Sequence, residues 1–208
     1  MRLRAFSIAI ERGGRRLFAD LSFDVAAGEA LIVSGANGSG KSSLLRAILG
    51  LLPLAAGRFA FEGGAANASV GEQAHYLGHL DALKGALTAR ENLAFSAASL
   101  GGGWGGALGV AAALERVGLA HAADLPVRAL SAGQKRRVAL ARHLVAARPL
   151  WLLDEPLGAL DAAAQARLNV ILRDHLGAGG LLVVSTHAPL GLAGAKAIQL
   201  DGAALAAA

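Results

Sequence analysis

The chain has 208 residues, carries a formal net charge of +5 and contains no cysteine. A chain of this length can bury a core in one domain, or in one domain with a subdomain, without help from metals or disulfides. The absence of cysteine excludes a disulfide framework, thiol catalysis and a cysteine-based zinc site, and it is typical of a reducing compartment such as the cytoplasm. The positive charge suits an anionic partner, either a nucleotide, a phospholipid surface or nucleic acid, and does not distinguish among them.

No export signal or membrane span is expected. The N-terminal residues have no apolar stretch long enough for a signal peptide, because charges return at Glu11 and Arg12. The uncharged stretch from 92 to 114 has the length of a bilayer span, but its many glycines make it too weakly hydrophobic for insertion. We therefore predict a glycine-rich surface loop between two helices in this stretch.

The N-terminal part of the chain predicts three strands followed by a helix. Residues 3–10 and 21–25 are expected to form an antiparallel pair around a glycine turn. Residues 29–34 (EALIVS) are a short apolar run, which is typical of a buried parallel strand. A helix is predicted from 41 to 52, because apolar residues recur there at helical spacing and Pro53 would end it.

The rest of the chain predicts an α/β fold with an inserted helical part. Residues 150–153 and 181–185 are further apolar strands with a helical pattern at 161–176 between them, an alternation typical of a parallel sheet covered by helices. Residues 83–147 lack strong strand patterns and are expected to be helical. The predicted organisation is a single domain over 1–208, with a core at 1–78 and 149–208 and a helical subdomain at about 79–148.

A glycine-rich turn between the strand at 29–34 and the helix at 41–52 fits the phosphate-binding loop pattern GxxxxGK[ST]. Glycines let backbone N–H groups converge on phosphate oxygens, and the following helix N-terminus adds partial positive charge. Lys41 is expected to reach the β- and γ-phosphates, and Ser42 to ligate Mg²⁺. A dinucleotide-binding fingerprint is disfavoured, because its glycine spacing differs and Lys-Ser follows the glycines here. The predicted ATP-binding residues are Gly35, Ala36, Asn37, Gly38, Ser39, Gly40, Lys41, Ser42 and Ser43.

Two acids follow the apolar strand at 150–153. Such a pair can place one carboxylate, Asp154, on Mg²⁺ and the second, Glu155, beside the attacking water as a general base. Taken alone, an acidic pair after a strand is more often a helix cap or a solvated turn. The phosphate loop upstream favours the catalytic interpretation.

A third pattern opens a predicted basic helix. Ser131 and Gln134 have the spacing of a capping box, and the N–H groups of this helix end could face an anion. On its own, the pattern is more often an ordinary well-capped helix. The arginines that follow are expected to spread around an exposed, solvated face, and His143 and His175 are expected at the surface.

These motifs, in this order, resemble the ATP-binding cassette (ABC) family over essentially the whole chain. The matching segments are the phosphate loop, LSAGQ at 130–134, LLDEP at 152–156, the pair at 160–161, and His187 after a strand. The resemblance implies a P-loop NTPase core of ABC type, with a mostly parallel sheet, N-terminal antiparallel strands and an inserted helical subdomain. It also implies ATP and Mg²⁺ as cofactors and a head-to-tail dimer with a second copy of the chain.

The same resemblance implies ATP hydrolysis and a role for each motif residue. Ser131, Ala132, Gly133 and Gln134 would be the signature that closes in trans over the partner's ATP, Asp161 the dimer-loop aspartate, Glu155 and His187 the catalytic residues, and Ser42 and Asp154 the metal ligands.

Three positions depart from the family pattern. Ala132 replaces a signature glycine, and we expect nucleotide binding to survive because Gly133 remains. The expected Q-loop glutamine is missing, with His79 or Leu80 in its place, so Mg²⁺ contact and coupling between the lobes are expected to differ there. No aromatic residue near Arg12 matches the one that usually stacks on adenine, so an arginine-plane contact or weak stacking is expected.

Within the family, the chain is similar to the ATP-binding subunits of cytochrome c biogenesis, also called heme exporters. The similarity lies in Tyr76-Leu77-Gly78-His79, in LTARENL at 87–93 and in the segment 130–142. It implies an ATPase that powers heme export or heme-chaperone release, works with separate integral membrane subunits, and lies peripherally on the cytoplasmic face of the bacterial inner membrane. No direct heme site and no nucleic-acid partner are expected.

Two other functions remain as alternatives. A soluble ABC-type clamp acting on nucleic acid or ribosomes is supported only by the basic charge, and the usual long coiled-coil insertion or second cassette is not seen in this sequence. A small-molecule kinase would use the same phosphate loop but has no need of the LSAGQ helix.

Overall fold

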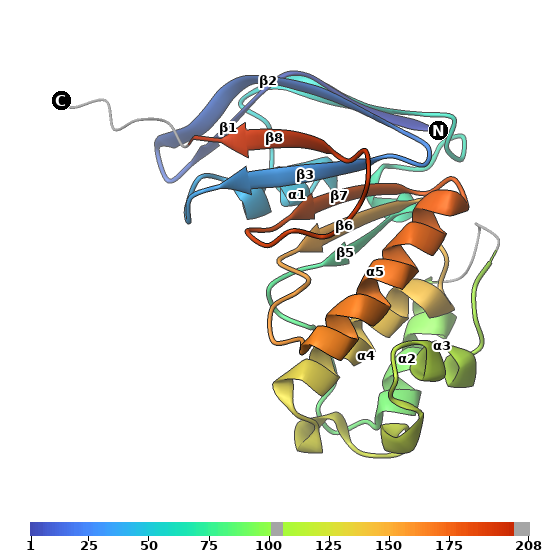
Figure 1. Ribbon diagram of the computed structural model, residues 1–208. Helices are drawn as coiled ribbons and strands as arrows, with labels where there is room; N and C mark the ends of the chain where they lie inside the picture. The colour runs from blue at the N-terminus through green and yellow to red at the C-terminus, as the bar shows by residue number, and fades with distance from the viewer. Residues whose placement is uncertain (101–105, 202–208) are drawn as a thin grey trace. The chain divides into compact units, whose positions relative to one another are not determined.

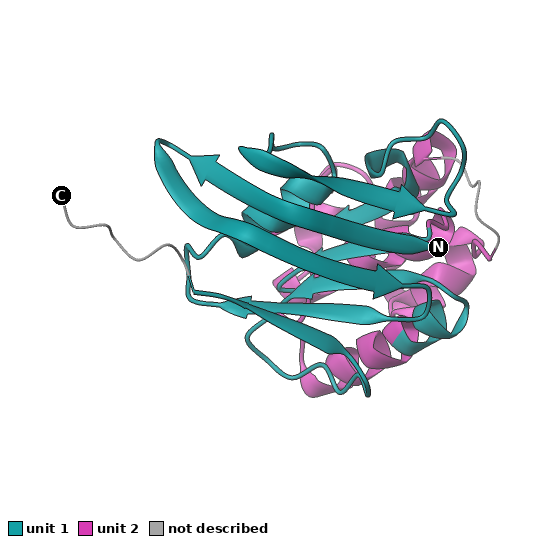
Figure 2. Ribbon diagram, turned by 90° about the horizontal axis from the view of Figure 1, so that it is seen from above, with its two compact units in different colours: residues 1–76, 149–155, 173–208 teal, residues 77–148, 156–172 magenta. Residues whose placement is uncertain are grey.

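The computed structural model describes residues 1–100 and 106–201. Residues 101–105 of the predicted glycine-rich loop lie outside the described residues. The chain forms two compact units, coloured separately in Figure 2. Unit 1 comprises residues 1–76, 149–155 and 173–208, and unit 2 comprises residues 77–148 and 156–172.

Two sheets form the framework of unit 1 (Figure 1). In the first, β1 (Arg2–Arg12) lies between β2 (Arg15–Ala26) and β4 (Ala56–Glu62) and pairs antiparallel with both. The second sheet has the order β5-β6-β7-β3-β8, made of β5 (Ala74–Leu77), β6 (Leu150–Asp154), β7 (Leu181–Ser185), β3 (Ala30–Gly35) and β8 (Lys196–Leu200). The pairings of β3 with β7, of β3 with β8 and of β6 with β7 are parallel.

One apolar core fills unit 1. It combines buried side chains of β1, β3, β6 and β7 with Leu44, Leu45 and Ile48 of helix α1 (Lys41–Ile48). The strands β6 and β7 are buried along their whole length, which is why they appear in the sequence as unbroken apolar runs. Truncating one of these leucines to alanine is expected to cost about 2–5 kcal/mol of stability. Because α1 packs against β3, the turn between them is held at the carboxyl end of β3.

All five predicted strands are confirmed, and the N-terminal pair is longer than predicted. The predicted end of the first helix is wrong, because α1 stops at Ile48 instead of continuing to Leu52. The backbone turns at Gly50, whose φ is 76°, and Leu51 N–H donates to the carbonyl of Arg46 at 2.9 Å. This glycine turn closes the helix before the proline is reached.

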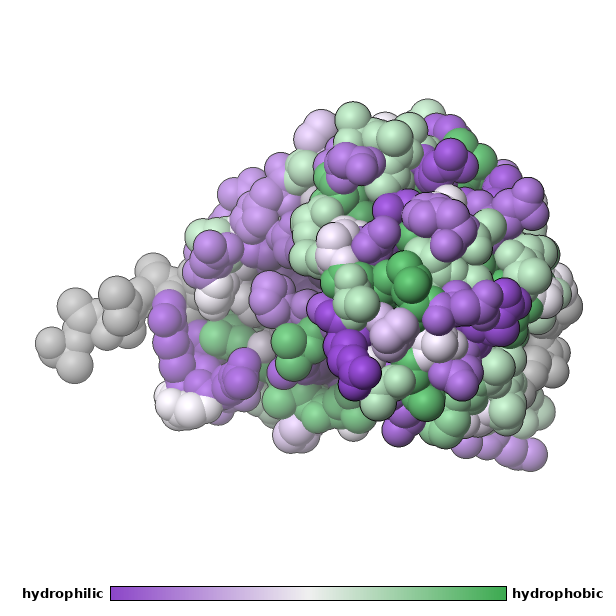
Figure 3. Space-filling model, turned by 90° about the horizontal axis from the view of Figure 1, so that it is seen from below, coloured by the Kyte–Doolittle hydropathy of each residue, from purple (hydrophilic) through white to green (hydrophobic). Residues whose placement is uncertain are grey.

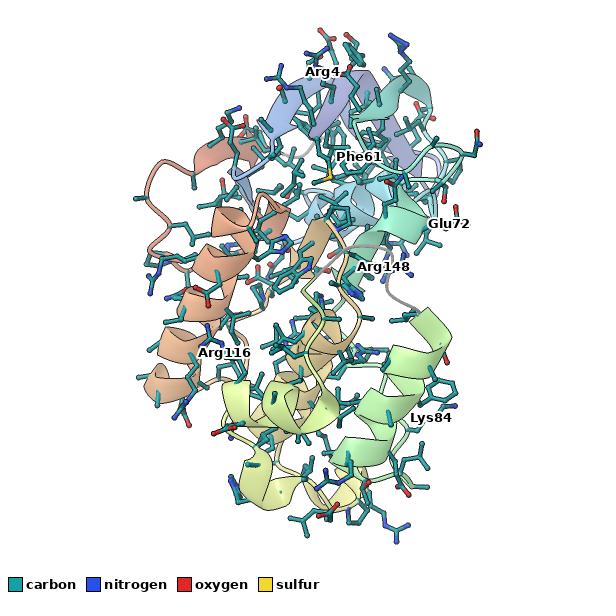
Figure 4. The ribbon with its side chains drawn as sticks, turned by 90° about the vertical axis from the view of Figure 1, so that its right-hand side faces the viewer. Arg4, Phe61, Glu72, Lys84, Arg116 and Arg148 are labelled. Carbon is teal, nitrogen blue, oxygen red and sulfur yellow. The ribbon has the colours of Figure 1, made fainter. Side chains whose placement is uncertain are left out.

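Unit 2 is mainly helical. Helices α2 (Ala89–Leu100), α3 (Val110–Arg116) and α4 (Ala132–Val145) pack against one another, and α5 (Ala162–Gly177) begins in this unit. Lys84, labelled in Figure 4, lies just before α2 with its Nζ 4.9 Å from the ring centroid of Phe95. Short 3₁₀ helices are η1 (Gly71–Gln73), in unit 1, and η2 (Ala120–Ala122) and η3 (Val127–Ala129), in unit 2.

The helices of residues 1–100 and 106–201 include none with the length and hydrophobicity needed to cross a bilayer. Hydrophilic and hydrophobic residues are mixed over the face drawn in Figure 3. The most exposed large apolar side chain on the described part of the chain is that of Leu80, at 80% exposure.

Candidate nucleotide-binding site

The carboxyl ends of three parallel strands of unit 1 are in register. Asp154 of β6 pairs with Ser185 of β7, and Ser185 is also the partner of Val33 in β3. The predicted phosphate loop starts at Gly35, two residues beyond Val33. Ligands of open parallel sheets bind outside this edge. Strand register therefore brings the predicted loop and the predicted acids to the same edge of one sheet.

Lys41 is the cation of the predicted phosphate loop. Its side chain is buried, and Nζ donates to the backbone carbonyls of Gly35 at 2.7 Å and Ala36 at 3.1 Å. Because both contacts are to neutral carbonyls, the positive charge remains uncompensated by them. A phosphate can supply the compensating charge in the same loop.

Two further features of the loop suit an anion. Helix α1 starts after Gly40, and no described side chain caps this end, so the partial positive charge of the helix N-terminus is directed into the loop. The hydroxyl of Ser39 is buried and has no hydrogen-bond partner among the described residues. A buried hydroxyl without a partner costs about 1–3 kcal/mol, a penalty that a phosphate oxygen would remove.

Asp154 is a buried carboxylate held by two hydroxyl groups of unit 1. Ser185 Oγ donates to its Oδ1, and the Tyr76 hydroxyl lies 3.5 Å from its Oδ2. Burial raises the pKa of Tyr76, which keeps this hydroxyl protonated and able to donate at neutral pH. Both oxygens of the acid are thus oriented from neighbouring strands.

Glu155 continues the chain in a left-handed conformation, with φ of 46°. Its N–H lies 3.0 Å from the Ser185 carbonyl and 3.3 Å from the Ser185 hydroxyl, so β7 anchors this turn. The imidazole of His187 comes within reach, because its Nε2 lies 3.4 Å from Glu155 Oε1. The structure therefore brings together the two residues predicted to be catalytic.

The residues predicted to bind Mg²⁺ fit that ion. Ser42 supplies a hydroxyl and Asp154 a carboxylate, which are the hard oxygen donors that Mg²⁺ prefers. Among the described residues, no group of three or more His, Cys, Asp or Glu side chains could hold a metal alone. Mg²⁺ commonly takes one or two protein ligands and completes its shell with water and substrate phosphates.

In unit 2, the predicted capping box at the start of α4 is confirmed. Gln134 N–H donates to Ser131 Oγ at 3.2 Å, and Ser131 N–H donates to the Gln134 side chain at 2.8 Å. Ala132 is exposed, whereas a Cβ added to Gly133 would lie 2.6 Å from the carbonyl oxygen of Ala159. The structure thus explains why a methyl group is accommodated at the first of these positions and excluded at the second.

The predicted dimer-loop aspartate follows closely after Ala159. Asp161 Oδ1 accepts a hydrogen bond from Ala164 N–H at 2.8 Å and so caps the N-terminus of α5. Ala159 has φ of 63°, an uncommon conformation for a residue with a side chain. The loop before Asp161 and the Gly133 turn of α4 are therefore in direct contact within unit 2.

The segment at the expected Q-loop position is attached to α4. Arg136 donates to the Gly78 carbonyl at 2.7 Å and to Asp81 Oδ1 at 3.0 Å, and Arg142 donates to the Asp81 carbonyl at 2.7 Å. His79 is exposed. The predicted solvation of the arginines is wrong for Arg136, which is 5% exposed and ion-paired.

Two histidine predictions are also wrong. His143 and His175 are buried rather than at the surface. The ring of His175 stacks on Trp151 with centroids 4.0 Å apart, and its Nε2 lies 3.1 Å from the Leu181 carbonyl.

An aromatic side chain that sequence reasoning did not single out lies beside the loop. A Cβ added to Gly40 would be 3.0 Å from the Phe18 ring, which therefore packs directly on the backbone of the predicted phosphate loop. Ser185 and Tyr76 are also additions to the predicted set. Tyr76 lies in a segment that carries the family similarity, but no role at the site was predicted for it or for Phe18 and Ser185; their roles follow from contacts between elements distant in the chain.

Together, the fold and the site define a nucleotide-binding protein of the phosphate-loop class. Residues 18–158 match the ABC transporter family, and the chain belongs to that family. A putative ABC transporter ATP-binding protein from Pyrococcus furiosus has the same fold, with a TM-score of 0.82 and 19% identity over 96% of this chain and 98% of that chain. The family and the fold class predicted from the sequence are confirmed.

Curated relatives match over nearly their full length. The chain is 53% identical over 193 residues to the cytochrome c biogenesis ATP-binding export protein CcmA of Rhodopseudomonas palustris (strain BisB5), covering 93% of this chain and 94% of the relative. It is 50% identical over 204 residues to the protein of that name from Bradyrhizobium diazoefficiens, covering 98% of this chain and all of the relative (100%).

Proposed function

We propose that this chain is the ATP-hydrolysing subunit of an ABC transporter complex that powers heme export or heme-chaperone release in cytochrome c biogenesis. The observation that carries the ATPase assignment is the phosphate loop with Lys41 at the same sheet edge as Asp154 and Glu155. The cytochrome c assignment is supported by relatives at about half identity that are named for that process.

In the proposed reaction, each side chain has a defined role. The loop N–H groups and Lys41 bind the β- and γ-phosphates, and Ser42 and Asp154 would hold Mg²⁺, which neutralises phosphate charge when bound. Glu155 accepts the proton of the attacking water. His187, 3.4 Å from Glu155, orients that carboxylate and the γ-phosphate.

The proposed assembly is a head-to-tail dimer of this chain on separate integral membrane subunits, at the cytoplasmic face of the bacterial inner membrane. In it, Ser131, Ala132, Gly133 and Gln134 of one copy would close over the ATP of the other, with Asp161 at the dimer contact. This proposal is supported by membership of a transporter family and by the name of export protein that the relatives carry.

Phosphate release from ATP, measured with Mg²⁺ and without any acceptor, tests the reaction. We expect release by the wild-type chain in its complex and none by Lys41→Ala, because the charge that binds the phosphates is lost. Phosphate transfer only when a small-molecule acceptor is added would instead indicate a kinase.

Affinity purification of the tagged chain from detergent-solubilised membranes tests the assembly. Integral membrane proteins are expected to accompany it. Ribosomes or nucleic acid in their place would favour the soluble clamp, against which the curated relatives already argue.

A further inference from the structure

Ser185, the last residue of β7, contacts both acids of the candidate site. Its side chain is 0% exposed, and its hydroxyl donates to Asp154 Oδ1. Glu155 N–H lies 3.0 Å from its carbonyl and 3.3 Å from its hydroxyl. One buried residue therefore fixes the carboxylate of Asp154 and the backbone of Glu155 together.

The contact to Asp154 restricts a side chain that would otherwise rotate. The carboxylate of an aspartate turns about two torsions, and the hydrogen bond from Ser185 fixes the direction of Oδ1. The partner of Oδ2 is weaker, since the Tyr76 hydroxyl is 3.5 Å away, at the limit of a hydrogen bond. Ser185 is therefore the closer of the two hydroxyl groups that orient this carboxylate.

The contact to Glu155 acts on the backbone. Glu155 has φ of 46°, a conformation that the surrounding contacts must hold in place for a residue with a side chain. The Ser185 carbonyl is one such contact, because it accepts the Glu155 N–H across the strand ends. The same residue thus sets where the Glu155 side chain leaves the sheet.

We propose that Ser185 is a positioning residue of the ATP site, whose hydroxyl orients Asp154 for Mg²⁺ while its carbonyl holds the turn at Glu155. This inference rests on the proposed function. The proposal assigns the Ser185 hydroxyl a specific effect. Mg²⁺ increases the affinity for ATP, and this increase depends on the hydroxyl. Nucleotide binding by the phosphate loop without metal does not depend on the hydroxyl.

Equilibrium binding of a fluorescent ATP analogue to the full chain, in MgCl₂ and in EDTA, measures this gain directly. Ser185→Ala is expected to lower the Mg²⁺-dependent gain about tenfold, because a hydrogen bond to a charged group is lost. Binding in EDTA is expected to stay within about twofold of wild type. Ser185→Thr keeps the hydroxyl and is expected to retain most of the gain.

Ser96→Ala is the matched control, since Ser96 is another buried serine, 8% exposed, whose hydroxyl donates to the Asn92 carbonyl in unit 2. It is expected to leave the gain unchanged. If Ser185→Ala does not fold, as judged by its thermal transition, Ser185→Cys provides the second test, because a thiol keeps a similar shape but is a weak hydrogen-bond donor. It is expected to lower the gain about two- to fivefold.

The inference is overturned if Ser185→Ala keeps the full gain, if Ser96→Ala loses as much, or if Ser185→Ala binds equally poorly in EDTA. With Ser185→Cys as the test, an unchanged gain overturns it. A wild-type chain that binds the analogue in neither buffer would overturn the proposed function itself, together with this inference.

Discussion

Replacing Gly133 by alanine is expected to destabilise the protein through a contact inside unit 2, independently of any nucleotide. The new Cβ would lie 2.6 Å from the Ala159 carbonyl oxygen, whereas ordinary van der Waals contact begins at 3.4 Å. Backbone atoms must therefore move apart by several tenths of an ångström. Ala159 is held at φ of 63°, so its peptide unit has little freedom to give way.

The expected cost follows from overpacking of this kind. Inserting a methyl group where the neighbours cannot relax typically costs about 1–3 kcal/mol. The usual gain from Gly→Ala in a helix is at most about 1 kcal/mol and offsets part of that cost. A net loss of about 1–2 kcal/mol would lower the thermal midpoint by about 2–8 °C for a chain of this size.

Urea and thermal unfolding of Gly133→Ala, followed by circular dichroism, measure the loss. Gly177→Ala is the matched control, because Gly177 ends helix α5 and an added Cβ there meets nothing within 4 Å. It is expected to be neutral or slightly stabilising. Equal midpoints for the two variants would refute the argument that the Ala159 loop excludes a side chain at 133.

Three other perturbations have defined outcomes. Burial lowers the pKa of His175 from 6.5 to about 4, so the unfolded chain takes up a proton at a higher pH than the folded chain. The free energy of unfolding should therefore fall by about 3 kcal/mol as the pH is lowered from 6.5 to 4. His175→Gln should reduce this dependence of stability on pH in urea titrations. Arg136→Met should lower the free energy of unfolding, measured by urea titration, by about 2–4 kcal/mol, because Asp81 and the Gly78 carbonyl lose their donor, while exposed Arg128→Met should not. Glu155→Gln should retain ATP in a dimer on gel filtration, while wild type releases it after hydrolysis.

The strands could be predicted because burial on both faces leaves a simple signal. Residues 150–153 and 181–185 are apolar without interruption, and β6 and β7 occupy these positions. The end of α1 could not be predicted correctly, because Gly50 and Pro53 are both stop signals and the nearer one decided. Sequence spacing alone does not say which of two such signals the backbone obeys.

The burial of polar side chains was the feature that the sequence predicted least well, because it depends on contacts between residues distant in the chain. Arg136 is buried because its partners Gly78 and Asp81 come from a loop far earlier in the chain. His175 is buried because its ring stacks on Trp151 of β6, with the ring centroids 4.0 Å apart. The helical spacing of residues in the sequence does not identify the contacts that bury Arg136 or His175.

The motif residues of the candidate site could be predicted, whereas the residues that orient them could not. The phosphate loop and the acids occupy contiguous, recognisable segments, and their positions follow from strand ends. Ser185 contacts Asp154 through the register of two parallel strands, and Tyr76 does so from a third strand. Such pairings depend on strand order, which the sequence pattern leaves open.

The most direct test of the account is ATP retention and cleavage by the purified chain with its membrane subunits and Mg²⁺. Wild type is expected to bind and split ATP, Lys41→Ala to do neither, and Glu155→Gln to bind ATP without splitting it. A wild-type complex that neither retains nor cleaves ATP would contradict the assignment of the loop at 35–42 and of the acids at 154 and 155.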